Sequence, residues 1–226
     1  MTPRAEQARR RRTGRPARLS RELVLRAAME IADEGGLEAL TMQRIGQRLD
    51  VEAMSLYRHV RNKEDILDGI VDLVFAEIEL PGDGVPWLTA LRARAVATRD
   101  ALARHPWTVG RMESRQRPGP ANLRHHDTVL GILYGEGFSS AMATHIYSVL
   151  DAYIYGFALQ ETNARVNTPV ALAEATTDAI EQMASDAYPH MQRVGRDLRA
   201  AGFQIGSAFE FGLDLILGAI EPLPQS

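Results

Sequence analysis

The residues with the clearest capacity for specific chemistry lie between Thr41 and Lys63. Leu56 is the one strong apolar anchor of a short helical segment at 52–59, so most of the other side chains there are expected to be exposed. Among those exposed side chains, Arg58 is the one that can form paired hydrogen bonds to guanine O6 and N7. Its alternative role is a contact with a phosphate. This chemistry points to nucleic acid as the binding partner.

The elements around Arg58 have the spacing of a helix-turn-helix. Thr41 is a suitable N-cap for a first helix, in which Ile45 and Leu49 share one face. Asp50 and Val51 form a tight connection to the second helix, residues 52–59. In this motif the second helix enters the major groove while the first crosses the backbone. The alternative is an ordinary helical hairpin on the surface.

Two further helices complete a compact head over residues 19–80. Leu23, Ala27 and Ile31 recur at helical spacing before the stop at Gly35 and Gly36. Asn62, with an acidic residue three positions later, resembles a capping box for a fourth helix. The sequence 81–84 (PGDG) interrupts the chain, so we place a domain boundary there.

Charge is distributed unevenly along the 226 residues. Residues 1–63 carry a net charge of +6 and the rest carry −9. A basic end suits a polyanionic partner better than a uniformly acidic chain would. Residues 1–18, with four consecutive arginines at 9–12, are expected to form a flexible basic arm that either follows phosphates or is a solvated tail.

Residues 81–226 continue the helical pattern, and no convincing strand is present, so the fold class is all-α. Helices are expected near 86–104, 107–113, 121–135, 139–162 and 204–220, with two more between 171 and 199. The segments 139–162 and 204–220 are apolar on more than one side, which is more than a single contact would hide. Gly206, Gly212 and Gly218 would permit close helix approach. We expect a homodimer through these two segments; the alternative is that both are buried in a monomer.

Several function classes are excluded by what the sequence lacks. Without cysteine there is neither a disulfide framework nor a thiolate zinc site. No run reaches the roughly 18 apolar residues of a membrane-spanning helix, and 45% apolar content argues against disorder. The histidines form no metal-binding pair, and no nucleotide-binding or nucleophile motif is present. We expect a cytoplasmic protein, nucleoid-associated when bound to DNA, with no cofactor, no metal, no membrane contact and no enzymatic activity.

Residues 40–72 (LTMQRIGQRLDVEAMSLYRHVRNKEDILDGIVD) closely resemble the DNA-binding head of the tetracycline-repressor (TetR) family of bacterial transcriptional regulators. Residues 156–161 (GFALQE) and 209–220 (FEFGLDLILGAI) are similar to segments of its tetracycline-repressor-like C-terminal class. The resemblance implies a helix-turn-helix head joined by a long helix to a ligand-binding and dimerisation domain at 81–226.

The resemblance also implies roles for individual residues. Tyr57 and Lys63 match phosphate-contacting positions, and His59 is more simply explained as filling the junction before the fourth helix. Three positions of the second helix match those that touch base edges. The full set of DNA-binding candidates is Thr41, Gln43, Ala53, Met54, Ser55, Tyr57, Arg58, His59 and Lys63.

A pocket for an unknown small-molecule effector is implied by the family in the same way. The candidate lining residues, for each of which core packing is an alternative, are Trp107, Met112, Tyr134, Tyr153, Phe157 and Gln160. The metal-chelating set of the namesake is not reproduced, because Val129, Ala152 and Gln160 stand at those places. The implied function is a repressor that binds a palindromic operator and is released by a ligand. Alternatives are an activator, a ligand-blind DNA binder, and an all-α enzyme or carrier.

Overall fold

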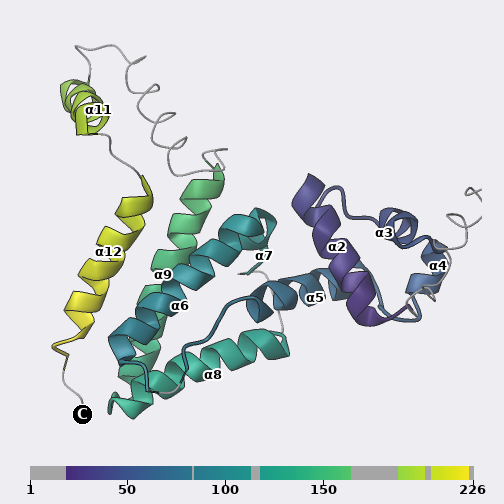
Figure 1. Cartoon of the computed structure of the whole chain (residues 1–226), viewed down its shortest axis with the longest axis horizontal. Helices are drawn as coiled ribbons and strands as arrows, with labels where there is room; N and C mark the ends of the chain where they lie inside the picture. Colours follow the sequence, from purple (N-terminus) through teal and green to yellow (C-terminus); the bar gives the residue numbers. More distant parts are fainter. Residues whose placement is uncertain (1–18, 83, 113–117, 164–187, 202–204, 224–226) are drawn as a thin grey trace, which may run out of the picture. The chain divides into compact units, whose positions relative to one another are not determined.

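The computed structural model describes residues 19–82, 84–112, 118–163, 188–201 and 205–223, and these residues form helices and connections without a strand. The all-α fold class is therefore confirmed (Figure 1). The elements are α2 (Arg21–Gly35), α3 (Met42–Leu49), α4 (Ala53–Leu56), α5 (Lys63–Ala76), α6 (Trp87–Arg104), η1 (Pro106–Thr108), α7 (Val109–Met112), α8 (Pro120–Gly135), α9 (Ser140–Asn163), α11 (Pro189–Ala201) and α12 (Ile205–Ile220).

The chain divides into two compact units that meet inside α5, between Leu67 and Asp68. The first turn of α5 belongs to one unit and the remaining turns belong to the other. The sequence prediction places a boundary later, after Leu80, at the break in residues 81–84. The helix α5 is continuous across the structural boundary after Leu67. The predicted boundary between a DNA-binding domain and a ligand-binding domain stays a prediction.

The first unit is held together by side chains from each of its helices. Ser20 Oγ accepts a hydrogen bond from Leu23 N and begins α2, which ends at Gly35 before Gly36, where φ is 71°. Only glycine adopts this backbone region without cost, which is why the glycine pair stops the helix as predicted. The fully buried core consists of Val24, Ala28, Ile31, Ile45, Leu56 and Ile66.

The connection between α3 and α4 depends on a close backbone approach. Thr41 Oγ1 accepts from Arg44 N at 3.2 Å, so the predicted N-cap of α3 is confirmed. Asp50 closes the helix in the left-handed region, with φ of 54°, and Val51 N then donates to Gly46 O at 2.9 Å. A Cβ on Gly46 would lie 2.7 Å from Val51 O. The turn therefore requires a residue without a side chain at this position.

The second helix of the motif is shorter than the sequence predicts. It extends from Ala53 to Leu56 instead of 52–59, and residues 57–59 form a turn. Glu52, at the N-cap, makes no side-chain hydrogen bond to the helix. With no side-chain cap and one buried anchor, little holds further helical turns here. Leu56 is fully buried, as predicted.

The second unit is built around α9, which packs against α6, α8 and α12 (Figure 1). Its central core residues are Leu91, Leu133, Leu150, Ile154, Phe209 and Leu213. The later turns of α5 join this unit through Asp72, whose carboxylate accepts from Ala121 N and Asn122 N at the start of α8. These bonds satisfy backbone donors that the helix itself leaves unpaired.

The expected helices of the second unit agree with the structure. The segment near 107–113 divides into η1 and α7, and α11 accounts for one of the two segments expected between 171 and 199. The other segment, and the basic arm at 1–18, lie outside the described residues. Among the helices that are described, none has the length and apolar character required to cross a bilayer.

Replacing Gly46 by alanine is expected to lower the free energy of unfolding of the first unit by about 1–3 kcal/mol, because the new methyl group would overlap Val51 O. Gln47→Ala, at the next and exposed position of α3, is the matched control and should change stability by less than about 0.5 kcal/mol. Urea unfolding followed by circular dichroism measures both. Equal midpoints for the two variants would contradict the close approach.

Candidate nucleic-acid interface

The α4 segment presents exposed side chains around one buried anchor. Met54 is 76% exposed and Tyr57 is 48% exposed, while Leu56 between them has no exposed surface. Arg58 is exposed, and its guanidinium has no hydrogen bond or ion pair with any described residue. Within the described residues, two consecutive positions therefore offer an exposed aromatic ring and a guanidinium without an ion-pair partner.

The other DNA-binding candidates of the sequence analysis lie in the same unit. Ala53, Ser55 and His59 are half-buried, and Gln43 is exposed on the first turn of α3. Thr41 is exposed, but its hydroxyl already caps α3. Lys63 is exposed at the first residue of α5, where its Nζ lies 3.4 Å from Leu37 O. At this position the partial positive charge of the helix N-terminus adds to that of the ammonium group.

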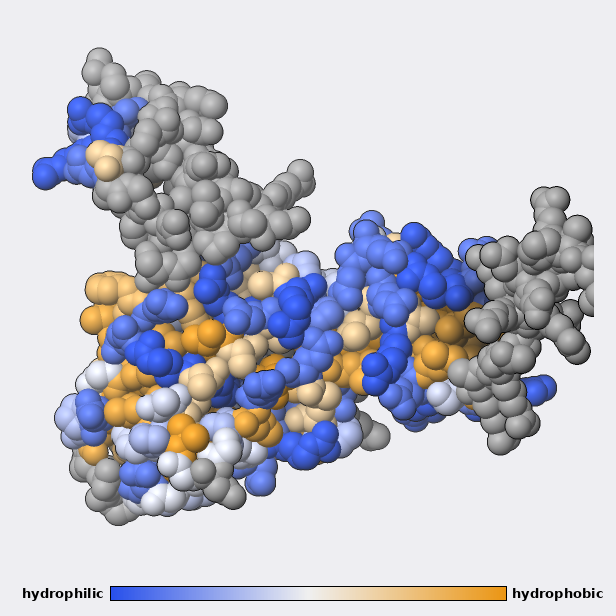
Figure 2. All heavy atoms as spheres, in the orientation of Figure 1, coloured by the Kyte–Doolittle hydropathy of each residue, from blue (hydrophilic) through white to orange (hydrophobic). Residues whose placement is uncertain are grey.

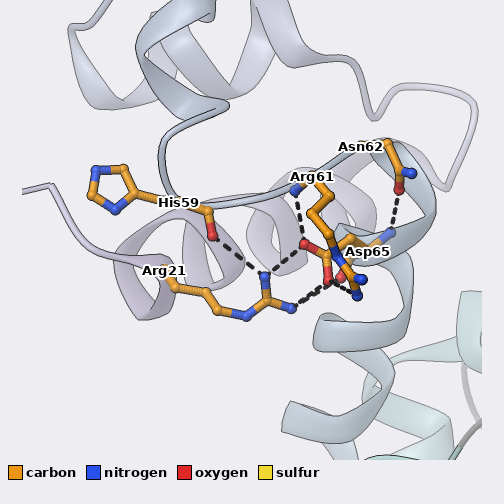
Figure 3. Close-up of polar contacts among 5 residues, drawn as sticks. All are labelled: Arg21, His59, Arg61, Asn62 and Asp65. Carbon is orange, nitrogen blue, oxygen red and sulfur yellow. Dashed lines mark hydrogen bonds and ion pairs between the residues drawn. The ribbon is translucent and has the colours of Figure 1, made fainter.

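The carboxylate of Asp65 joins the start of α2 to the chain that follows α4 (Figure 3). Arg21, at the start of α2, donates to both carboxylate oxygens at 2.7 and 2.8 Å. Arg61 N donates to Asp65 Oδ2 at 2.9 Å. Arg21 Nη1 also donates to His59 O at 3.4 Å. Asn62 Oδ1 accepts from Asp65 N at 2.8 Å, which confirms half of the predicted capping box.

The reciprocal half of that box is replaced by an ion pair. The Asp65 side chain is 9% exposed and points to Arg21 instead of to the Asn62 backbone. The hydrogen bonds from Arg21, and then those from Arg61, hold the pKa of the Asp65 carboxyl far below its usual range, although burial opposes them. The sequence pattern identified the cap but not the arginine, because Arg21 lies 44 residues away.

Two family comparisons cover nearly all of the described chain. Residues 24–70 match the model described as bacterial regulatory proteins, tetR family. Residues 80–223 match the model described as tetracyclin repressor-like, C-terminal domain. The chain belongs to the tetR family of bacterial regulatory proteins. Members of this family are transcriptional regulators rather than enzymes, and the helix-turn-helix of the first unit is its DNA-binding element.

Individual relatives agree with this placement. The chain is 34% identical over 215 residues to the HTH-type transcriptional repressor DrrR1 of Streptomyces coeruleorubidus, covering 91% of this chain and 78% of that protein. The structure of SCO7222, a TetR from Streptomyces coelicolor, superposes with a TM-score of 0.73 at 27% identity, covering 89% and 97% of the two chains. A TetR variant from Acinetobacter baumannii in complex with minocycline superposes with a TM-score of 0.67 at 26% identity, covering 92% and 96%.

The structure describes the surroundings of five of the six effector-pocket candidates of this TetR-family chain. Tyr153 and Phe157 are in ring contact and pack against Phe209 of α12. Tyr134 is 49% exposed near the end of α8, and Gln160 is exposed. Trp107 lies edge-on to His105, and nothing is described of the Met112 side chain. Tyr153 and Phe157 therefore have the surroundings of core residues, and a ligand role for the six stays a prediction.

Three residues stand at the places where the namesake of the family has its metal-chelating groups, and their surroundings differ. Val129 is fully buried in the core, and Ala152 and Gln160 are exposed. Over the described ranges, no group of three or more histidine, aspartate or glutamate side chains has the arrangement of a metal site.

A buried polar cluster between α6, α8 and α9 was missed by the sequence analysis. Arg94 has no exposed surface; its Nε donates to His125 Nε2 at 3.2 Å and its side chain pairs with Asp151 at 2.5 Å. Tyr147 lies beside this guanidinium, which is 5.3 Å from the centre of the tyrosine ring. The available signal was Arg94 itself, a charge on the apolar stripe formed by Leu91, Ala95 and Leu102.

The helices α9 and α12 each keep large apolar side chains at the surface. Phe211 is 67% exposed and Leu215 61% exposed on α12, and Val149 on α9 is 51% exposed. Figure 2 shows apolar residues gathered over the region of α12. Of the three glycines predicted to permit close approach, Gly212 does so, because a Cβ there would overlap the Tyr153 hydroxyl, whereas a Cβ on Gly218 would meet nothing within 4 Å in the described chain. These two helices are therefore buried on one side and apolar on the other, as the sequence predicts.

Replacing Asp65 by asparagine is expected to lower the free energy of unfolding by about 1–2 kcal/mol at pH 7. The effect is limited because the Arg21 side chain is 45% exposed. Since the folded state lowers the carboxyl pKa below its ordinary 3.8, the stabilisation is complete above that value and is lost as the pH falls further. The difference between the wild type and the variant should narrow below about pH 4.

Urea unfolding at a series of pH values measures this dependence. Glu38→Gln, at an exposed acid of the same unit, is the control and should have little effect at any pH. A difference for Asp65→Asn that is unchanged from pH 7 to pH 3 would contradict the role of the charge.

Proposed function

We propose that this TetR-family regulator is a homodimeric repressor that binds a palindromic operator and leaves it when a small molecule binds the second unit. The observation that carries the proposal is the exposed segment 53–58, in which Met54, Tyr57 and Arg58 are exposed and the Arg58 guanidinium is unpaired among the described residues. The hydrogen bonds of Asp65 hold the chain that follows this segment. Similarity to a transcriptional repressor over 91% of the chain supports it.

The residues divide into two kinds of DNA contact. Thr41, Gln43, Tyr57 and Lys63 are assigned to phosphates, which position the head without reading sequence. Arg58 reads guanine in the major groove, together with the small and apolar side chains at 53–55. His59 serves the fold as well, because its carbonyl accepts from Arg21. The arginines of residues 1–18 add to the salt dependence, at about 0.9 log unit for each phosphate neutralised.

A second copy of the chain covers the exposed apolar faces of α9 and α12. One head reads only a few base pairs, so a two-fold pair is needed for specificity, with half-sites about 34–36 Å apart or at a multiple of that spacing. The exposed Val149, Phe211 and Leu215 supply the apolar surface that such a contact requires.

The effector binds in the second unit and opposes operator binding. The minocycline complex of a relative supports a small molecule, whereas Val129, Ala152 and Gln160 argue against metal-assisted tetracycline binding here. By linkage, effector and operator lower each other's affinity by the same factor. An activator or a DNA binder without a ligand response would share the fold. A promoter reporter assayed with candidate effectors distinguishes these alternatives from a repressor that is released by its ligand. An all-α enzyme is disfavoured by the family and by the lack of a catalytic motif.

Replacing Arg58 by alanine is expected to weaken operator binding by about 1–3 kcal/mol and to relax the preference at one base pair. Lys63→Ala is the matched comparison and should weaken operator and random DNA alike, since a phosphate contact carries no sequence information. DNA selected from a random pool by the purified protein supplies the operator, and fluorescence anisotropy measures affinity. An equal loss on random DNA for Arg58→Ala would refute base reading.

Replacing Phe211 by aspartate is expected to convert the dimer into monomers and to reduce operator affinity, because the charge would be buried in the contact between copies. Light scattering coupled to size exclusion measures the mass. Glu210→Gln, at the preceding exposed position, should remain dimeric. Circular dichroism checks folding, which should be unchanged because Phe211 is 67% exposed within its own chain. A dimeric Phe211→Asp variant would place the interface elsewhere.

A further inference from the structure

A surface cavity lies between the second half of α8 and the chain that enters α6. Its volume is about 380 Å³, and its lining includes Val85, Trp87, Thr128, Ile132 and Glu136. Cavities of this size, from about 300 Å³ upwards, accommodate small molecules. Among the described residues that line it, none is an effector-pocket candidate and none belongs to α9 or α12. The cavity is therefore separate from the predicted effector pocket and from the face assigned to the second copy.

Two glycines of α8 leave this space open. Gly131 and Gly135 lie one helical turn apart, and both line the cavity. A Cβ on either would meet no other part of the described chain within 4 Å, whereas a Cβ on Gly46, Gly119 or Gly212 would overlap a neighbour. A glycine in the interior of a helix, as Gly131 is, weakens the helix relative to alanine. Close packing does not explain this glycine, and room for a bound molecule does.

The end of α8 carries negative charge without a counterion. Glu136 directly follows the helix and is half-buried, and its carboxylate forms no ion pair with any described residue. No basic residue lies in the last turn of α8. The C-terminus of a helix carries a partial negative charge, to which an acid at this position adds. A cation in the cavity would therefore be stabilised by both the carboxylate and the helix end.

Trp87 adds an aromatic surface that also favours a cation. Its indole is half-buried and lies edge-on to Phe138, with 5.6 Å between the ring centres, so the core fixes its position. The face of an indole attracts cations more strongly than that of any other aromatic side chain. Val85 and Ile132 supply apolar walls to the same cavity. An unpaired carboxylate, an indole and apolar side chains thus line one space.

This lining discriminates between classes of ligand. An anion would be repelled by Glu136 and by the end of α8. A neutral molecule would cover the Glu136 carboxylate without giving it a counterion, which is unfavourable. A bare metal ion requires several oxygen ligands, and over the described ranges no three acidic or histidine side chains gather to hold one. A positive group attached to an apolar body matches both the charge and the walls.

We propose that this cavity binds a small organic ammonium ion. The positive group contacts the Glu136 carboxylate and the Trp87 indole, and the apolar part packs against Val85 and Ile132. The site is additional to the proposed effector pocket and does not depend on operator binding. A bound ion contacts α8 and the chain that joins α5 to α6, so it holds these two segments together.

Three small probes with the same apolar body test the charge selectivity on the full-length protein. They are phenethylamine, which is a cation at neutral pH, 2-phenylethanol, which is neutral, and phenylacetate, which is an anion. In ligand-observed NMR titrations the cation should bind at least about tenfold more tightly than either of the others, because only it pairs with the carboxylate and the indole. A smaller preference, or no binding of the cation, would overturn the proposal.

Glu136→Gln and Asp127→Asn locate the charge that is responsible. Asp127 is exposed on the same helix and does not line the cavity, so it is the matched control. Glu136→Gln should lower the affinity for phenethylamine to that for 2-phenylethanol and leave the affinity for the alcohol unchanged. Asp127→Asn should keep the preference for the cation. A preference that survives in Glu136→Gln, or an equal loss in Asp127→Asn, would show that the cation binds elsewhere and would overturn the proposal.

Gly131→Leu tests the space itself. The leucine side chain would enter the cavity without meeting another part of the described chain, and leucine is a better helix former than glycine. The midpoint of urea unfolding should therefore be unchanged or raised, while binding of phenethylamine should be lost. A lowered midpoint would show that the space at Gly131 is not open, and wild-type binding would show that the cavity is not the site. Either result would overturn the proposal.

Discussion

The hydrogen bonds to the Asp65 carboxylate are the constraint on which the first unit depends. One buried group joins the start of α2, the chain before α5 and the first turn of α5. The helix α4 has four residues and one buried anchor, too little to maintain its own conformation. The side chains that we propose to meet DNA are therefore positioned by the segment that follows α4 and by Leu56 beneath it, more than by helix formation.

The helix α9 has a comparable role in the second unit, because its sides serve different purposes. Leu150 and Ile154 enter the core, Val149 faces outward, and Tyr147 and Asp151 belong to the polar cluster with Arg94. One helix thus borders both the buried polar cluster and the exposed apolar surface that we assign to the second copy.

Local features of the chain could be predicted from the sequence, and distant partners could not. The Thr41 cap, the stop at Gly36 and the amide of Asn62 act on residues within four positions, so their residue types were informative. Arg94 and His125 lie 31 residues apart, and periodicity gives only the face of a helix on which each falls. The same limit explains why Trp107 and Tyr134 were grouped with Tyr153: aromatic character indicates burial but not which rings meet. The length of α4 was overestimated because the segment has no side-chain cap and one buried anchor, so little holds further helical turns.

Lys63 has a practical consequence, since it is the one lysine among the 226 residues and no cysteine is present. Its ammonium group is exposed at the first residue of α5. A reagent selective for lysine side chains would attach one spectroscopic label to each natural chain, beside the DNA-facing segment. In a pair of chains, the distance between the two labels would report the separation of the two heads, without any engineered residue.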